Sequence, residues 1–308
     1  MISFRYHIVS LVAVLLALGA GVALGSGPLE RENKPETTST TGAPQSSAED
    51  EAYTRVNDGF AASLQAGMTN ARLRGRTVTL LVLPGAAPDQ VTALTSAVTQ
   101  AGASLAGAVR ISEDLVNPSK RQLVDELGGQ LEASATKVII DTGAGTYDRI
   151  GALLAFAVST AAPAGDPVDQ QGKGILAGLS TAGLLSMDKE LQRRGNLVLV
   201  VAGPAGDGGD ADAGGASIVT SLAKALDAGS GGVVVAGPLS AADPAGVLTA
   251  VRNDTAAVTA VSTVDIADVP AGRIITVLAL AEQAAKGAGQ YGGGAGVTGL
   301  YPGVGPIG

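Results

Sequence analysis

Residues 8–29 form a stretch of 22 positions without one Asp, Glu, Lys, Arg or His side chain. At a helical rise of about 1.5 Å per residue, this stretch is long enough to cross a hydrocarbon layer of roughly 30 Å. The short segment before it carries the amino terminus and Arg5, and positive charge there favours a cytoplasmic N-terminus. The pattern predicts a cytoplasmic tail at 1–7, a single-pass anchor in the cell membrane at 8–29 and an extracytoplasmic main domain.

A cleaved signal peptide is the alternative to an anchor, because Ala23-Leu24-Gly25 before Ser26 is a small-x-small pattern. As an anchor or as a signal peptide, this segment would export the rest of the chain. Ala17, Gly21 and Gly25 recur every four residues, and small residues at this spacing let two membrane helices approach closely. They are the candidate helix–helix interface of a homodimer, although Gly and Ala are common in membrane helices generally.

Two segments connect this stretch to the main domain. Residues 30–48 are rich in Thr, Ser and Pro and predict a flexible tether, because they bury too little apolar surface to offset the entropy lost on ordering. Residues 49–75 predict a stalk helix whose apolar side chains lie three or four positions apart. These are Tyr53, Val56, Phe60, Leu64 and Met68. The stripe suits either a two-stranded stalk or packing against the domain that follows.

Short apolar runs alternate with helical patterns over residues 76–287. The clearest runs are at 78–83, 104–111, 197–201, 233–236 and 258–264, with a further short strand predicted at 137–140. Continuous apolar runs mark strands covered on both faces, and helices between them imply parallel crossovers. The predicted fold class is therefore α/β, a three-layer domain around a mostly parallel sheet. Residues 288–308 are rich in Gly and predicted to be disordered.

Composition excludes several classes of function. The chain has no Cys, and its one histidine, His7, precedes the predicted anchor. Ser-His-Asp, Cys-His and zinc sites therefore cannot form in the exported part. The formal net charge of −8 argues against a nucleic-acid partner, because phosphate binding needs faces rich in Lys and Arg.

Three near-motifs fail on spacing or context. Residues 165–174 resemble a P-loop but have six residues between the glycines instead of four. Residues 138–144 resemble an aspartic-protease loop around Asp141, yet no second copy exists, so a strand-end turn is the better interpretation and a carboxylate hydrolase a weak alternative. The acidic Gly-rich segment 203–215 follows a predicted strand, where α/β folds bind ligands. It lacks dinucleotide and calcium-loop spacing and is interpreted as a solvated loop.

Both ends of the chain resemble an actinobacterial copper-transport family called MctB, also described as SteB. The N-terminal likeness lies in residues 1–27, MISFRYHIVSLVAVLLALGAGVALGSG; the C-terminal likeness lies in VSTVD at 261–265, GRIITVLALAE at 272–282 and Tyr291. The resemblance implies an envelope protein linked to copper efflux, with an outer-membrane channel role attached to the family name. The SteB description implies an inner-membrane protein that works with a SteA-like membrane partner in cell separation.

The residues themselves offer little for copper. Cu(I) prefers Cys, Met or His, and the exported part provides only Met68 and Met187 as such ligands. No cofactor and no catalytic residue are predicted, copper enters through the resemblance alone, and metal ligands stay unassigned. The sequence therefore predicts a non-enzymatic scaffold or regulator that binds an envelope or division partner at the membrane. The alternative is a component of copper efflux.

Overall fold

The computed structural model describes residues 48–206 and 208–303. The predicted cytoplasmic tail, the anchor with Ala17, Gly21 and Gly25, and nearly all of the tether lie outside these ranges. Among the residues that are described, no helix combines the length and apolarity needed to cross a membrane. The chain divides into a unit Met1–Glu51 and a unit Ala52–Gly308, and the second unit contains the sheet.

The second unit is a mixed α/β fold around a seven-stranded sheet of order β3-β2-β1-β4-β5-β6-β7. All neighbouring strands are parallel except β2 and β3, so the predicted, mostly parallel sheet is confirmed. The strands are β1 (Thr77–Val82), β2 (Ser104–Ile111), β3 (Leu185–Ser186), β4 (Leu197–Val201), β5 (Gly232–Ala236), β6 (Ser262–Val264) and β7 (Gln290–Tyr291). The predicted strand at 137–140 is wrong, because these residues lie in a loop.

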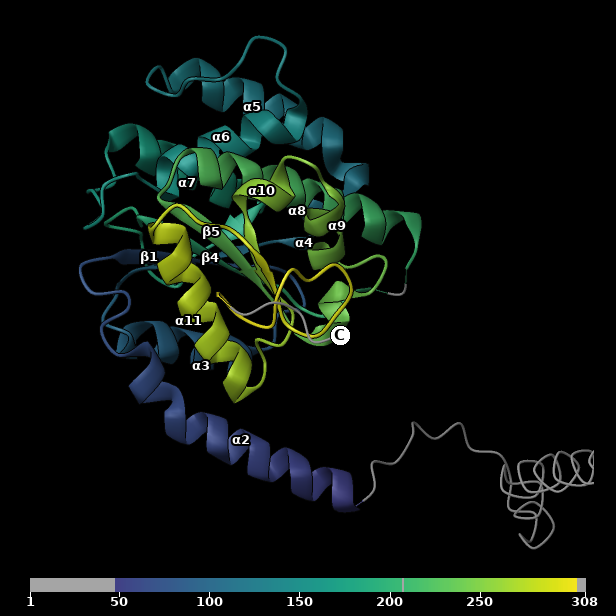
Figure 1. Ribbon diagram of the computed structural model, residues 1–308. Helices are drawn as coiled ribbons and strands as arrows, with labels where there is room; N and C mark the ends of the chain where they lie inside the picture. Colours follow the sequence, from purple (N-terminus) through teal and green to yellow (C-terminus); the bar gives the residue numbers. More distant parts are fainter. Residues whose placement is uncertain (1–47, 207, 304–308) are drawn as a thin grey trace, which may run out of the picture. The chain divides into compact units, whose positions relative to one another are not determined.

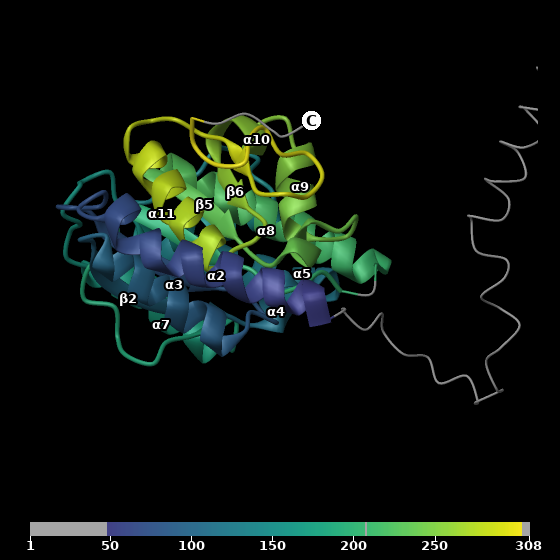
Figure 2. The same ribbon diagram turned by 60° about the horizontal axis from the view of Figure 1, so that its bottom comes forward.

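Helices cover both faces of the sheet. Helices α3 and α11 lie side by side on one face, and α6, α7, α8 and α9 lie on the other, with α5 outermost (Figures 1 and 2). The helices are α2 (Ala48–Thr69), α3 (Pro88–Gln100), α4 (Glu113–Val116), α5 (Arg121–Ser134), α6 (Thr146–Val158), α7 (Gln170–Thr181), α8 (Asp210–Ala228), α9 (Val247–Asn253), α10 (Ala257–Ala260) and α11 (Pro270–Ala284), with short 3₁₀ turns at Pro118–Lys120 and Leu239–Ala242. The predicted stalk helix at 49–75 thus ends at Thr69.

The central strand β4 is apolar throughout because it contributes side chains to two cores. Along β4, the side chains of Val198 and Val200 belong to the core on the α6–α9 side. Those of Leu197, Leu199 and Val201 belong to the core on the α3–α11 side. Successive side chains of a strand point to opposite faces, and burial of each contributes roughly 1.5–3 kcal/mol to the free energy of unfolding.

Close packing of α6 against α8 depends on Gly151. A Cβ atom placed there would lie 2.7 Å from the Cβ of Ala225. We expect Gly151→Ala to lower the free energy of unfolding by about 1–3 kcal/mol, because overpacking forces the helices apart. Urea unfolding of the full chain measures this. Gly129→Ala on α5 is the matched control, since Gly129 has open space around it. This change should raise the free energy of unfolding by about 0.5–1 kcal/mol, because alanine has the higher helix propensity. Equal effects of the two changes would contradict the packing argument.

The expectation of a disordered tail at 288–308 is wrong for residues 288–303. Residues Gln290–Tyr291 form β7 beside β6, and the Thr298 N–H donates to the Gln290 carbonyl over 2.7 Å. Gly292 has a φ of +125°, and a Cβ there would overlap the Asp265 carboxylate. The glycines that predicted disorder instead allow the chain to close over a buried carboxylate.

Candidate functional site

The helix α2 presents an apolar face to solvent. The exposed fractions are 69% for Val56, 65% for Phe60, 40% for Leu64 and 38% for Met68. These residues follow one another at intervals of four, so they lie on one side of the helix. Tyr53 precedes them in the stripe and is 62% exposed. The structure therefore leaves on the surface the stripe for which the sequence predicted either a two-stranded stalk or packing against the domain that follows.

Its C-terminal end attaches α2 to the rest of the unit. Thr69 is buried, and the Gln65 side chain donates a hydrogen bond of 3.2 Å to Gln100 at the end of α3. Toward its N-terminus the helix contains Gly59, which has open space around it and lowers helix propensity. In proteins, most of the stability of a helix comes from packing of its apolar face. The exposed apolar face is therefore suited to association with another helix.

A crevice opens at the carboxyl ends of β1 and β4. These neighbours are the switch point of the sheet, because successive strands are added outward from β1 on one side and from β4 on the other. A cavity of about 360 Å³ is lined there by the segments that follow both strands and by the first turns of α8. The two segments touch, since a Cβ on Gly203 would overlap the backbone of Gly85. In open α/β sheets this is the usual position of a ligand site.

The chemistry of the crevice disfavours phosphate ligands. Its polar lining residues are Glu113, Asn117 and Asp212, and no Lys or Arg is among the described residues that line it. Asn117 Oδ1 accepts hydrogen bonds from Ser119, and Asp212 accepts from the Gly208 N–H over 3.2 Å. The acidic lining would repel an uncompensated phosphate. The predicted solvated loop at 203–215 is helical from Asp210 onward.

The other singled-out residues do not converge on one site. Asp141 is exposed on the loop between α5 and α6. Met68 lines a cavity beside α11, whereas Met187 lines a different one beside α7. Within the described ranges, no three His, Cys, Asp or Glu residues are grouped so that they could hold a metal ion.

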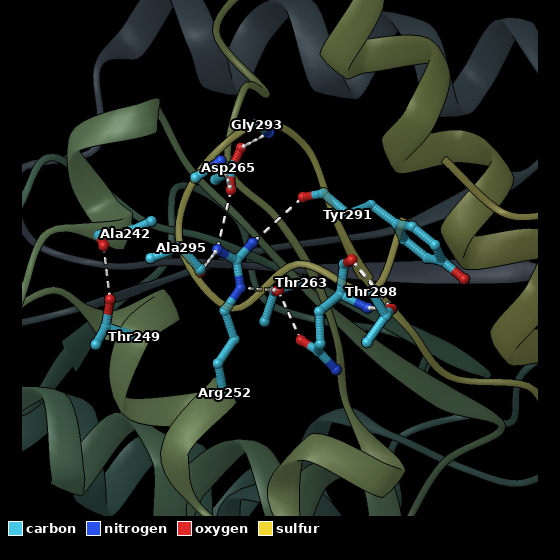
Figure 3. Close-up of polar contacts among 11 residues, drawn as sticks. Ala242, Thr249, Arg252, Thr263, Asp265, Tyr291, Gly293, Ala295 and Thr298 are labelled. Atoms are coloured by element: carbon cyan, nitrogen blue, oxygen red, sulfur yellow. Dashed lines mark hydrogen bonds and ion pairs between the residues drawn. The ribbon is translucent and has the colours of Figure 1, made fainter. Parts of the chain in front are cut away.

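A buried ion pair lies where α9 meets the end of β6. Arg252 Nη1 is 2.9 Å from Asp265 Oδ2, and the two side chains are 2% and 0% exposed. Asp265 also accepts hydrogen bonds of 2.9 Å from the N–H groups of Gly293 and Gly294. Figure 3 shows the Arg252 guanidinium pointing at Asp265 and at the carbonyls of Ala295 and Tyr291. The pair therefore fixes the C-terminal loop on the sheet.

Two further contacts complete this network. Arg252 Nε donates to Thr263 Oγ1 over 2.9 Å, and Thr263 donates to Gln290 Oε1 over 2.7 Å. Burial lowers the pKa of Arg252, and the neighbouring Asp265 carboxylate opposes this shift. The Tyr291 hydroxyl donates to Glu282 over 2.5 Å. Burial raises the pKa of Tyr291, and the neighbouring Glu282 carboxylate raises it further. All of its members are partnered, so the network is interpreted as structural.

Comparison with known proteins places the chain in a family. The family model described as "Copper transport outer membrane protein, MctB" matches residues 1–302. The chain belongs to the MctB family. The copper transporter MctB of Mycobacterium tuberculosis is 29% identical over 324 residues, which cover 96% of this chain and 98% of the relative. The copper transporter MctB of Mycobacterium leprae is 29% identical over 316 residues, which cover 97% and 99%.

The family resemblance predicted from the two ends of the chain is therefore confirmed, and it extends over the whole domain. The C-terminal stretch that carried the resemblance, residues 261–265 with Tyr291, contributes Thr263, Asp265 and Tyr291 to the buried network. Sequence reasoning did not single out Arg252. The one sequence feature that could have pointed to Arg252 is its position as an arginine in an otherwise apolar segment, a few residues before a predicted strand.

Proposed function

We propose that this MctB-family protein is a non-enzymatic envelope protein, anchored in the cell membrane by residues 8–29, that acts as a scaffold or regulator. Its extracytoplasmic α/β domain would bind membrane partners instead of transforming a substrate. The observation that supports this proposal is the apolar face of α2, with Val56 and Phe60 about two-thirds exposed (69% and 65%). An exposed apolar face on a soluble domain marks an interaction surface.

The simplest occupant of this face is α2 of a second copy. A homodimer with paired α2 helices would also bring two predicted anchors together, so that Ala17, Gly21 and Gly25 could form a close helix–helix contact. A SteA-like membrane partner, implied by the family resemblance, would then bind the dimer. Replacing Gly21 and Gly25 by leucine tests the anchor contact, because unchanged self-association in the membrane would remove it from the proposal.

Topology has its own test. Protease added to spheroplasts should digest the α/β domain, while a cytoplasmic marker protein stays intact, and the uncut chain should sediment with membranes. Release of the chain into the soluble fraction would contradict the anchor and favour a cleaved signal peptide. Protection of the domain until the cells are lysed would contradict its extracytoplasmic position.

A component of copper efflux is the second candidate, and the names of the family and of its mycobacterial relatives favour it. Copper would then be cargo, and the two methionines would be its only thioether ligands in the described domain. They line separate cavities, which supports an indirect role through a partner over direct metal handling.

We expect the Met68→Leu/Met187→Leu variant to confer the same copper tolerance as the unchanged protein. Growth of a deletion strain in graded copper, complemented with each version, measures this, and the empty strain provides the baseline. Leucine keeps the apolar volume of methionine and removes only the sulfur. If tolerance fell to that of the empty strain, direct copper handling would replace the scaffold proposal.

A further inference from the structure

A second cavity, of about 670 Å³, lies among α6, α8 and the loop that joins α5 to α6. Its size is within the roughly 300–1,000 Å³ of small-molecule sites. Small side chains make up much of its wall, because α6 and α8 place alanines there. These are Ala152, Ala155, Ala225 and Ala228, with Phe156 among them. The wall is therefore apolar and leaves room for a chain of methylene groups.

The apolar wall continues into the loop. Val138, Ile139 and Ile140 also line the cavity, and they are the run that the sequence predicted to be a strand. Val138 and Ile140 pack partly against the core, whereas Ile139 is 92% exposed. Covering this exposed isoleucine with a bound apolar group would remove its surface from water and so stabilise the complex.

One end of the cavity carries excess positive charge. The Arg194 guanidinium lies 4.5 Å from the centroid of the Phe156 ring. Arg194 Nη2 is 2.9 Å and Lys137 Nζ is 3.2 Å from the Asp169 carboxylate. One carboxylate therefore faces two cations at this end of the cavity. Arg194 Nε is buried and donates to no protein group.

The remaining charged groups do not cancel this excess. Lys224, at another part of the wall, is paired with Asp254 over 3.0 Å. Asp141 and Asp148 also line the cavity, and both are exposed to solvent, as is the Lys137 side chain at 63%. Water screens all three, so the buried cation of the wall is Arg194, whose side chain is 12% exposed. The cavity is therefore asymmetric, with a cationic end at Arg194 and an apolar wall along α6 and α8.

We propose that this cavity binds an anionic amphiphile, with its carboxylate or phosphate head at Arg194 and Lys137 and a single acyl chain along the alanines of α6 and α8. The guanidinium is held by Phe156 and Asp169, and its remaining N–H groups can donate to an oxyanion. The acyl chain covers Ile139 and fills the space that the alanines leave. This site is separate from the exposed face of α2 and does not depend on the proposed function.

Photo-crosslinking tests the proposal on the full chain in lipid nanodiscs. The probe is dodecanoate that carries a diazirine on its chain, and labelled peptides are mapped by mass spectrometry. We expect labels within residues 137–144, 152–156 and 221–229. A dodecanol probe with the same diazirine should label these segments at least tenfold less, because it lacks the anionic head. Competition by unlabelled fatty acid or by a lysophospholipid distinguishes the two sources of the head group.

Three variants sharpen the test. Arg194→Gln should reduce labelling at least tenfold, and Ala228→Phe, at an exposed position on the wall, should block the space without disturbing the core. Arg110→Gln is the matched control, because Arg110 is an exposed arginine paired with one aspartate, Asp188, and it does not line this cavity. Labelling spread evenly over the surface, labelling unchanged by both cavity variants, or equal labelling by dodecanol would overturn the proposal.

Discussion

Replacing Phe60 and Leu64 together by aspartate should convert the full chain from a dimer to a monomer. Both side chains lie in the centre of the exposed face of α2, at 65% and 40% exposure. In paired helices they would be buried against the second copy, and four carboxylates brought into that contact would each lose hydration without a partner. We expect at least a hundredfold weaker self-association, measured by analytical ultracentrifugation in detergent.

The stability of the domain should change little in this variant, because both residues are exposed and surface substitutions usually alter the free energy of unfolding by about 0.5 kcal/mol or less. Leu123→Asp on α5 is the matched control, since Leu123 is 43% exposed but does not belong to the face. A dimer that survives the double substitution on α2 would show that self-association does not use this face.

Arg252→Met should lower the free energy of unfolding by about 3–5 kcal/mol, the largest stability effect that we expect from one substitution. Methionine fills much of the volume of arginine but leaves the Asp265 carboxylate, which is 0% exposed, without its cation. The carbonyls of Ala295 and Tyr291 also lose their donor. Urea unfolding, followed by far-ultraviolet circular dichroism, measures the change.

Lys224→Met is the control for this prediction. It breaks the pair with Asp254, whose two side chains are about one-third exposed (34% and 31%), so the loss should stay below about 1 kcal/mol. The C-terminal loop supplies an independent readout. In the Arg252→Met variant, limited proteolysis should cut within 293–303 before any other part of the domain, because the loop loses its attachment to the sheet. Equal losses in the two variants would contradict the role assigned to the buried pair.

The sheet could be predicted from sequence because its strands are encoded locally. The run at 197–201 is apolar at every position, and that at 78–83 at every position except Thr79, which is typical of a strand covered on both faces. The apolar residues 138–140 have a similar local character but lie in a loop beside a cavity. What separates the two cases is a neighbouring strand with free hydrogen-bonding groups, and that depends on strand order.

The C-terminal loop could not be predicted for a related reason. A glycine-rich segment reads as disordered because it buries little surface of its own. Its order comes from two residues outside the segment. Asp265 accepts hydrogen bonds from its backbone N–H groups, and Arg252 donates one to its backbone carbonyl. The crevice between β1 and β4 likewise exists only once the strand order is known. Local composition carries none of this information.

Photo-crosslinking in growing cells tests the central claim of binding through α2 most directly. A photoreactive amino acid replaces Phe60 in one strain and Leu123 in another, and covalent products are identified after irradiation. Our account predicts a crosslink from position 60 to α2 of a second copy and none from position 123. A membrane partner should co-purify with the crosslinked dimer. Products from position 123 alone, or none from either position while copper tolerance is normal, would contradict it.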